Sequence, residues 1–358
     1  MAFKKLFLVL VVVVALCSCK ENAEREKSTL SVFNTFHAIS EGMYSGDGSW
    51  GAGYPYRMAL RDAYWRADVY SELSEVASVY DARSLEAYAY LQSAQLEGGS
   101  GVFGFPADTD NPEFGETVNR IMLECPECIN GGWVTSLPGS HIAELYYDHG
   151  YSLASIAKGY IRTQDPSYVD SIVKAADWAL DKPLHSNINY LSALSKGLSY
   201  AYKVTGDTRY LNKAVYFHEQ GIFPNLSSET GAALDAHNQQ LEYHGFIVSG
   251  IIALKLVIPN NHDFAREVDK YLALSVLHMQ QRGAVEEGEY GSTWPGTNLL
   301  AWHELENIRP LTMEESLAKG RCASLINSYE KFIVEENGFR LQKALYSNFF
   351  IGLHDGVY

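Results

Sequence analysis

The sequence predicts an all-α protein built from helical hairpins, and three observations support this fold class. A turn motif occurs twice, and each copy follows an apolar segment whose large side chains recur at helical spacing. The segment after each turn is more polar and begins with Pro or Asp, which favour helix N-termini. Strand-like segments are few and short, at Gly101–Phe105 and Gly131–Thr135.

The turn motif defines the repeated unit. Its first copy is Thr163-Gln-Asp-Pro-Ser-Tyr-Val, its second is Thr205-Gly-Asp-Thr-Arg-Tyr-Leu, and a weaker third copy begins at Asn260. A helix that is apolar on nearly all sides must be buried, so each unit pairs a buried inner helix with an amphipathic outer one. The inner helices are expected at Tyr151–Arg162, Tyr190–Val204 and Phe246–Ile258.

Similar helices extend the pattern beyond the repeats. They are expected at Met58–Val79, Ala82–Leu96, Leu311–Glu336 and Leu341–Leu353. An open solenoid of the TPR or HEAT type also consists of helical hairpins, but its loops are short and regular. Here the copies are unevenly spaced, and long loops with Gly, Asn and His precede the inner helices. The pattern therefore favours a different arrangement of hairpins.

The first residues of the chain resemble a bacterial lipoprotein leader. Two lysines precede the apolar run Leu6–Leu16, which is shorter than the roughly 20 residues of a membrane-spanning helix. The run ends in Leu-Cys-Ser-Cys19, which resembles a lipobox, whose cysteine is lipidated after cleavage. We expect a signal peptide over residues 1–18 and a lipidated tether over residues 19–30. Such a leader implies attachment at Cys19 to a bacterial membrane, with the outer membrane favoured, on its periplasmic face or at the cell surface.

The composition narrows the classes of partner. A formal net charge of −15 argues against a nucleic-acid partner, because phosphate binding requires a basic face. No second apolar stretch is long enough to span a bilayer, so the lipid anchor is the membrane contact that we expect. The 24 Tyr and 6 Trp suit either a wet binding cleft or the seams between helices.

The cysteines and the acidic residues give little indication of a metal. Cys125 and Cys128 form a C-x-x-C pair, and Cys322 stands apart. A structural disulfide or plain thiols fit an exported protein best. A zinc site needs further ligands, and a redox site needs thioredoxin-like surroundings. We expect no cofactor and no metal, although the oxygen-rich run Asp108–Glu113 suits either a solvated turn or a structural calcium ion.

The succession of inner helix, T-G-D-x-x-Y-L-x-x-A turn and outer helix resembles the (α/α) toroids of carbohydrate-active enzymes. These include polysaccharide lyases, unsaturated-uronyl hydrolases and uronyl epimerases. The resemblance covers residues 145–282 well and the rest more loosely. It implies an all-α catalytic domain over residues 31–358, an (α/α) toroid of six or seven hairpins with minor short β-hairpins. In such toroids the loops before the inner helices converge at one end of the barrel and form the cleft.

Polar residues gather in the loops at the starts of the predicted inner helices. Helix capping accounts for about one of them per helix, so the surplus indicates a site. The candidate catalytic residues are His149, Asn187, His237, Tyr243 and His244. The candidate substrate-binding residues are Trp133, Asp148, Asn189, Tyr190, Gln239, Glu242, Trp294 and His303.

Two of these loops resemble those of alginate lyases of the toroid class. Those enzymes carry Asn-Asn-His at one inner helix, and an Arg and a Tyr around Leu-x-Tyr-His at the next. Aligned on Leu241–His244, this chain keeps Asn187 with Ser and Ile beside it. It has Gln239 in place of the Arg and Phe246 in place of the Tyr. The resemblance therefore supports the scaffold and leaves the reaction open.

Lytic cleavage of a uronic acid polymer is the first reaction that these residues suit. It requires a group that neutralises the sugar carboxylate, a base that removes the C5 proton and an acid that protonates the leaving oxygen. Asn187, Asn189 and His149 suit the neutralising role. Tyr243 and His244 suit the exchange of the proton. The expected partner is an anionic polysaccharide or oligosaccharide.

Three alternatives stay open. Hydrolysis requires two carboxylates or one that activates water, and Asp148, Asp235 and Glu242 are available for it. A uronyl epimerase would use the same scaffold. A glycan-binding lipoprotein without catalytic activity would keep the aromatic side chains and would not need the His and Tyr set. The separation of these side chains in space decides between the alternatives.

Overall fold

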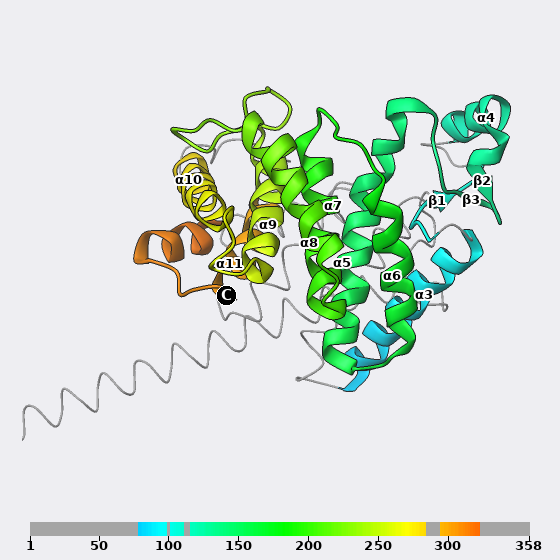
Figure 1. The fold of residues 1–358 in the computed structure, drawn as a ribbon, viewed down its shortest axis with the longest axis horizontal. Coiled ribbons are helices and arrows are strands. Elements are labelled where there is room, and N and C mark those ends of the chain that lie inside the picture. The colour runs from blue at the N-terminus through cyan, green and yellow to red at the C-terminus, as the bar shows by residue number, and fades with distance from the viewer. Residues whose placement is uncertain (1–77, 99–100, 111–114, 284–293, 323–358) are drawn as a thin grey trace, which may run out of the picture.

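The computed structural model describes residues 78–98, 101–110, 115–283 and 294–322, and this part of the chain is mostly helical (Figure 1). The predicted all-α class is therefore confirmed, together with a small β-sheet. The predicted leader, the tether and its Cys19, nearly all of Met58–Val79, and Leu341–Leu353 lie outside the described residues.

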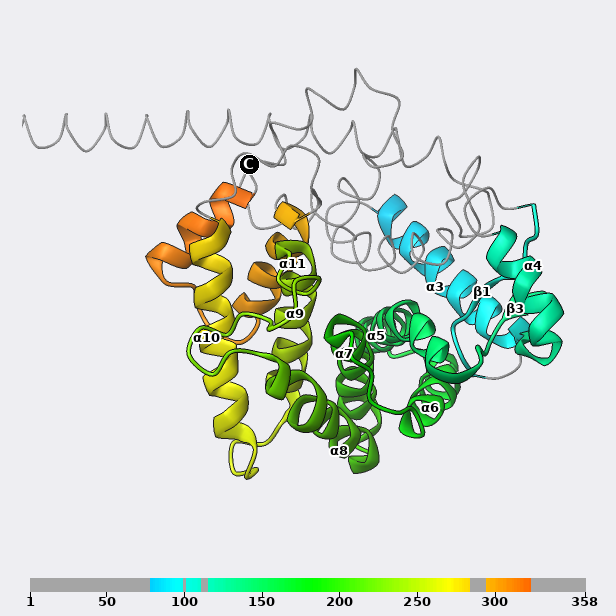
Figure 2. The same cartoon turned by 90° about the horizontal axis from the view of Figure 1, so that it is seen from above.

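Seven helices of the described part form two layers (Figure 2). The inner helices α5, α7, α9 and α11 contact one another in chain order, and the outer helices pack behind the inner helix that precedes each of them. The inner layer comprises α5 (Tyr146–Thr163), α7 (Ile188–Thr205), α9 (Leu241–Val257) and α11 (Trp294–Glu306). The outer layer comprises α6 (Ser167–Leu180), α8 (Thr208–Phe217) and α10 (Ala265–Gly283).

The repeated turn motif makes the same hydrogen bonds in both copies. In the first, the Thr163 hydroxyl donates to a carbonyl of α5 and accepts the Asp165 N–H at 3.2 Å. The Asp165 carboxylate then accepts the Ser167 N–H at 2.9 Å, which starts α6. Thr205 and Asp207 form the same bonds at the turn from α7 to α8. The motif thus ends one helix and starts the next, as capping residues do.

Glycines set the spacing and the direction of the inner helices. A side chain at Gly150 in α5 would place its Cβ 2.2 Å from the Ala193 carbonyl oxygen of α7. A Cβ at Gly250 in α9 would lie 2.8 Å from the Ser192 carbonyl oxygen of the same helix α7. Gly150 and Ala193 both lie early in their helices, as do Gly245 of α9 and Asn298 of α11, where a Cβ at Gly245 would lie 2.7 Å from Asn298 Oδ1. The loop that leads into α9 also contacts Asn189 in the first turn of α7, so the inner helices begin at the same end and run in the same direction. Their N-terminal ends define one end of the array, which we call the mouth.

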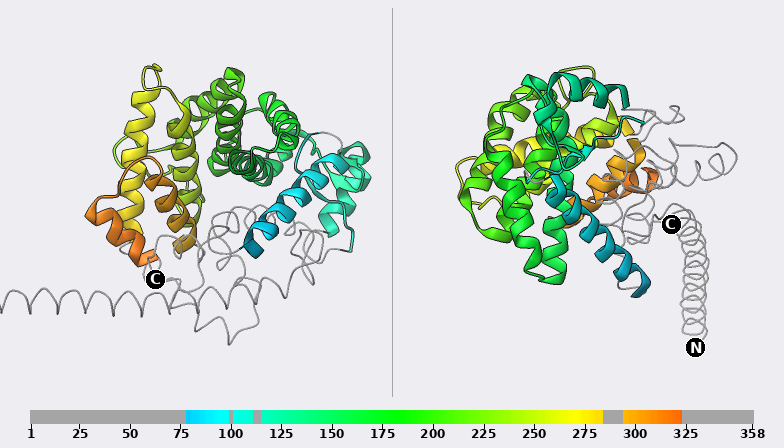
Figure 3. Two further views of the ribbon diagram at one scale, coloured as in Figure 1. Left: turned by 90° about the horizontal axis from the view of Figure 1, so that it is seen from below. Right: turned by 90° about the vertical axis from the view of Figure 1, so that its right-hand side faces the viewer.

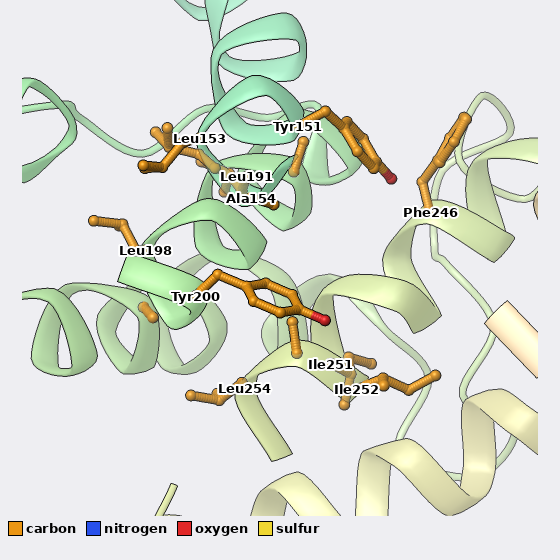
Figure 4. Close-up of a cluster of buried hydrophobic side chains, with 14 of the residues drawn as sticks. Tyr151, Leu153, Ala154, Leu191, Leu198, Tyr200, Phe246, Ile251, Ile252 and Leu254 are labelled. Atoms are coloured by element: carbon orange, nitrogen blue, oxygen red, sulfur yellow. The ribbon is translucent and has the colours of Figure 1, made fainter. Parts of the chain in front are cut away.

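The core lies between the two layers and between neighbouring inner helices. Leu191, Leu198, Ile251 and Leu254 are buried there with the rings of Tyr151 and Phe246 (Figure 4). No helix within the described ranges is long and apolar enough to cross a bilayer.

A smaller unit precedes the hairpins. Helix α3 (Ser78–Gly98) packs on α5, and α4 (Gly115–Glu124) lies beyond it, on the opposite side of the array from α10 (Figure 3). The strands β1 (Phe105–Pro106), β2 (Ile129–Asn130) and β3 (Trp133–Val134) form an antiparallel sheet in the order β1-β3-β2. Short helical turns are η1 (Pro126–Cys128), η2 (Gly139–Leu145), η3 (His218–Ile222) and η4 (Phe223–Asn225). Residues 313–322, the described part of the helix expected at Leu311–Glu336, are also helical.

The C-x-x-C pair forms a disulfide between Cys125 and Cys128, and both cysteines are buried. The Cys128 carbonyl accepts the N–H groups of Thr135 and Ser136, so the crosslinked turn is also tied to the end of β3. This is the structural disulfide among the expected alternatives.

Candidate functional site

The mouth brings together side chains from α7, α9 and the loop between α8 and α9. Asn189 is in the first turn of α7, and its Nδ2 lies 3.5 Å from Nε2 of His237. The His237 imidazole stacks on the Tyr243 ring, with centroids 4.2 Å apart and an interplanar angle of 27°. His237 is exposed, whereas Tyr243 is half-buried. A buried carboxamide thus lies beneath an exposed imidazole and a half-buried phenol, because Asn189 is 1% exposed.

Asn187 and Tyr190 lie beside this cluster at the start of α7. Asn187 is the N-cap residue of α7, and its N–H donates to Nδ1 of His185 at 3.0 Å. Its side-chain Oδ1 is buried and has no hydrogen-bond partner among the described residues. The Tyr190 ring stacks on His185, with centroids 5.9 Å apart. Sequence reasoning named Asn187 and Tyr190 but did not name His185 as a candidate.

The loop before α9 is held by its own side chains. The Asp235 carboxylate accepts the backbone N–H and the side-chain N–H groups of Asn238 at 2.9–3.1 Å. Gln239 is exposed, donates to the Ala233 carbonyl at 3.1 Å, and accepts an N–H of Arg282 from α10 through its own carbonyl. These bonds fix the loop that carries His237.

His149 lies away from the mouth cluster, in the seam between α5 and α6. Its ring is fully buried, its Nδ1 accepts the Phe103 N–H at 3.1 Å, and its Nε2 is 3.1 Å from the Ala175 carbonyl oxygen of α6. Burial lowers the pKa of His149 to about 3 in spite of the bond to Ala175. Because both ring nitrogens are engaged, the geometry assigns this side chain to holding the helices together, and not to substrate neutralisation.

His244 has the equivalent position in α9. Its Nε2 lies 2.9 Å from the Ser275 carbonyl oxygen of α10, its ring is fully buried, and the ring of His278 packs against it. Burial lowers the pKa of His244 to about 4. The expectation that His244 joins Tyr243 in proton exchange therefore gives way to His237, the imidazole that contacts the Tyr243 ring.

The remaining candidates are dispersed. Trp133 is buried in β3, and Asp148 is buried in the first turn of α5. Glu242 is half-buried on α9, and His303 is half-buried on α11. The side chain of Trp294 lies outside the described residues. None of these five has a described contact with His237.

A buried ionic cluster on the inner helices was missed by sequence reasoning. Lys196 of α7 donates to Glu304 of α11 at 2.5 Å and to the Ser249 hydroxyl of α9 at 2.7 Å, and Ser249 donates to the other oxygen of Glu304. Lys158 of α5 lies 3.9 Å from Glu304. Burial alone would raise the pKa of Glu304, but the two lysines and Ser249 outweigh it and hold that pKa below its ordinary value.

The cluster lies on the same helix faces as the mouth residues. Asn189 and Lys196 are two turns apart on one stripe of α7, as Glu242 and Ser249 are on α9, because seven residues complete about two helical turns. Lys196 is 2% exposed. The sequence contains an indication of this cluster, because polar residues seven positions apart interrupt helices that are otherwise apolar.

The described residues contain no group of three or more His, Cys, Asp or Glu side chains that could hold a metal ion. In the run expected to suit calcium, the Asp108 carboxylate accepts the Asp110 N–H at 3.0 Å, and residues 111–114 lie outside the described part. Comparison of the chain with models of protein families and with curated proteins finds no match.

Proposed function

We propose that the protein is a polysaccharide lyase that cleaves an acidic, uronate-containing glycan by β-elimination at the mouth. The observation that carries the proposal is the meeting of asparagine, His237 and Tyr243 side chains at the mouth. His237 is exposed there, Asn187 and Tyr243 are half-buried, and Asn189 lies buried behind His237. These are the three chemical types that elimination requires: a carboxylate-binding amide, a base and a phenolic acid. The N-termini of parallel inner helices add partial positive charge where a sugar carboxylate would bind.

In the proposed reaction, half-buried Asn187 donates a hydrogen bond to the uronate carboxylate and stabilises the negative charge that develops there, while buried Asn189 orients His237 through its contact with Nε2. His237 removes the C5 proton, and Tyr243 donates its hydroxyl proton to the O4 leaving group. The C5–H and C4–O4 bonds break, a C4=C5 double bond forms, and the released chain gains a hydroxyl group. Solvent carries the proton from His237 back to the Tyr243 phenolate, which completes the cycle.

Hydrolysis receives less support from the carboxylates. Asp148 is buried, and Asp235 accepts bonds from Asn238 that hold the loop. Of the three candidates, Glu242 alone is half-buried without a described bond, and a hydrolase acting through one carboxylate would need it to activate water. An epimerase would share the base and the neutralising amide but would return the C5 proton to the opposite face of the sugar.

An (α/α) toroid is part of the same proposal, and the described hairpins support it. The support consists of the two layers, the parallel inner helices and the repeated turn bonds. The proposal extends this arc to a closed ring of six or seven hairpins. It predicts that the loops before the inner helices surround one cleft.

We propose the lipid anchor from the sequence of the leader alone. A protein lipidated at Cys19 would act outside the cytoplasm, tethered to a bacterial membrane. Metabolic labelling with a fatty-acid probe should label the full chain and not a Cys19→Ala variant, because the thioether forms at that sulfur. Equal labelling of the two proteins would overturn the anchor and leave the site untouched.

The test of the lyase is an ultraviolet absorbance assay on a panel of uronate polymers: alginate, polygalacturonate and glucuronate-containing glycans. Elimination leaves a conjugated double bond that absorbs, whereas hydrolysis and epimerisation do not. We expect absorbance to rise with at least one polymer. New reducing ends without absorbance would point to hydrolysis, and binding without either product would point to a glycan-binding protein.

A further inference from the structure

The mouth carries a second ring pair that matches the one beside Asn189. Tyr190 and Tyr243 occupy the same position in the first turns of α7 and α9. Each lies nearly parallel to a histidine from the preceding loop: His185 and Tyr190 at an interplanar angle of 23° with centroids 5.9 Å apart, and His237 and Tyr243 at 27° in closer contact, with centroids 4.2 Å apart. The repeat therefore forms the same imidazole–phenol platform at two neighbouring inner helices.

Polar groups connect the two platforms. His185 accepts the N–H of Asn187, the buried Oδ1 of Asn187 has no partner among the described residues, and Asn189 reaches His237. Axes of packed helices lie roughly 8–10 Å apart, which is wider than one sugar ring. This spacing suits successive units of a sugar chain, one at each platform, better than it suits a single monosaccharide.

Beyond His185 the mouth continues to a pocket between α4 and η2. The pocket has an apolar floor with charged groups at its rim, and it is lined by Thr117, Arg120, Ile121, Glu124, Cys125, Leu137, Pro138, His141 and Glu144. Because η2 leads directly into α5, the pocket lies at the end where the inner helices begin.

A hydrogen bond ties the pocket side of the mouth to the loop of the second platform, because the hydroxyl of Tyr146, directly after η2, donates to the Pro183 carbonyl at 3.2 Å. The Glu144 carboxylate lies 3.1 Å from Nδ1 of His141 at the pocket rim. Burial lowers the pKa of His185, and the negative charge of Glu144 opposes that effect, so Glu144 lies within electrostatic reach of His185. The pocket, the second platform and the His237 cluster thus follow one another along the mouth.

We propose that the His185–Tyr190 platform, continued by the pocket between α4 and η2, binds sugar units distant from the cleaved bond, so that the ligand is an oligosaccharide chain. The proposal rests on the proposed function for the acidic class of the glycan. Aromatic rings present flat apolar surfaces to the C–H faces of sugars, and their polar edges bind hydroxyl groups. Arg120 at the pocket rim supplies a guanidinium, which suits a uronate carboxylate.

The test compares His185→Ala with His262→Ala in the mature full-length chain. The two histidines make the same local bond, since each Nδ1 accepts the N–H of the residue two positions later, at 3.0 and 3.1 Å. His262 lies at the opposite end of the array, in the turn between α9 and α10. Both variants therefore lose the same kind of local hydrogen bond. They differ in whether the lost histidine lies at the mouth or at the opposite end.

Calorimetric affinities are measured for disaccharides, tetrasaccharides and hexasaccharides prepared from alginate and from polygalacturonate. We expect wild-type affinity to rise with length. His185→Ala should lower hexasaccharide affinity by about three- to tenfold, the usual effect of one lost aromatic contact, and leave disaccharide affinity unchanged. His262→Ala should leave all affinities unchanged.

The outcomes separate this inference from the lyase. Turnover without any chain-length effect of His185→Ala would overturn the distant subsites and leave the lyase standing. A chain-length effect without turnover would support the subsites and overturn elimination. If the wild type binds neither series at any length, the subsites for acidic glycans are overturned together with the proposed function.

Discussion

Three buried histidines each join an inner helix to the outer helix of its own hairpin. His149 and His244 reach carbonyls of α6 and α10, and His218 at the end of α8 lies 3.1 Å from the Ser195 hydroxyl of α7. Burial lowers the pKa of His218 to about 4, as it does that of His244, and that of His149 to about 3. All three are therefore neutral in the folded protein at neutral pH.

This arrangement predicts acid sensitivity. In the unfolded chain these imidazoles take up protons near pH 6.5, whereas in the folded chain they resist protonation until about pH 3–4. The unfolded state binds more protons in this window, so the free energy of unfolding falls as the pH drops below 6.5. Each histidine contributes about 1.4 kcal/mol per pH unit. Urea unfolding measured between pH 7 and pH 5 tests the slope.

His244→Gln serves as the matched variant, because its amide nitrogen still reaches the Ser275 carbonyl but does not titrate in this range. It should reduce the acid slope by about the contribution of one histidine. A slope as steep as that of the wild type would show that His244 is not one of the titrating groups.

At the mouth, the hydroxyl of Tyr243 is predicted to act in proton transfer. Tyr243→Phe keeps the ring that stacks on His237 and removes the acid, so turnover should fall by about 10²-fold or more while the melting temperature is unchanged. Tyr216→Phe on the exposed side of α8 is the control and should retain full activity. A normal rate combined with a lower melting temperature would give Tyr243 a structural role instead.

At the scale of helices, the Lys196–Ser249–Glu304 cluster ties α7, α9 and α11 together. Removing one partner of a buried ion pair leaves a desolvated charge, which typically costs about 3–5 kcal/mol. Glu304→Ala should therefore lower the free energy of unfolding by an amount of that order. Chemical denaturation of the full chain measures it.

The double variant Lys196→Met with Glu304→Leu removes both charges and fills the space with apolar side chains. It should recover most of the lost stability, since a well-packed apolar replacement of a buried ion pair is often neutral or stabilising. A double variant less stable than Glu304→Ala would show that the hydrogen bonds of the cluster, and not only the pairing of its charges, stabilise the three helices.

The inner helices were predictable because their apolar character and the turn motif are local properties of the sequence. The ranges expected at Tyr151–Arg162, Tyr190–Val204 and Phe246–Ile258 overlap α5, α7 and α9, although all three helices start earlier than expected, at Tyr146, Ile188 and Leu241. The starts were missed because polar residues such as Asp148 and Glu242 look like loop residues in sequence. They lie in the first turns of α5 and α9, where the sequence defines a helix boundary least well.

The direction of individual side chains was not predictable in the same way. Successive residues of a helix point about 100° apart, so Tyr243 faces α7 and His237, while His244 faces α10. The sequence groups these residues in one loop, and the helix separates them. The Lys196–Glu304 pair joins residues far apart in the chain, and no local pattern indicates such a partner.

At the scale of the whole molecule, the proposed ligand is an acidic glycan, whereas the protein itself has a net charge of −15. Attraction must then be local, from helix N-termini and from Arg120 at the pocket, since the overall charge repels the ligand. The glycan should accordingly contact one end of the array and leave the other end free.

Hydrogen exchange with and without a saturating uronate hexasaccharide tests this central claim most directly. Protection is predicted in the segments around His185–Tyr190, around His237–Tyr243 and in η2, all at the mouth. The turns at Thr205–Asp207 and Pro259–Asp263, at the opposite end, should exchange at unchanged rates. Protection confined to those turns, or no protection at the mouth with any hexasaccharide of the panel, would contradict the account.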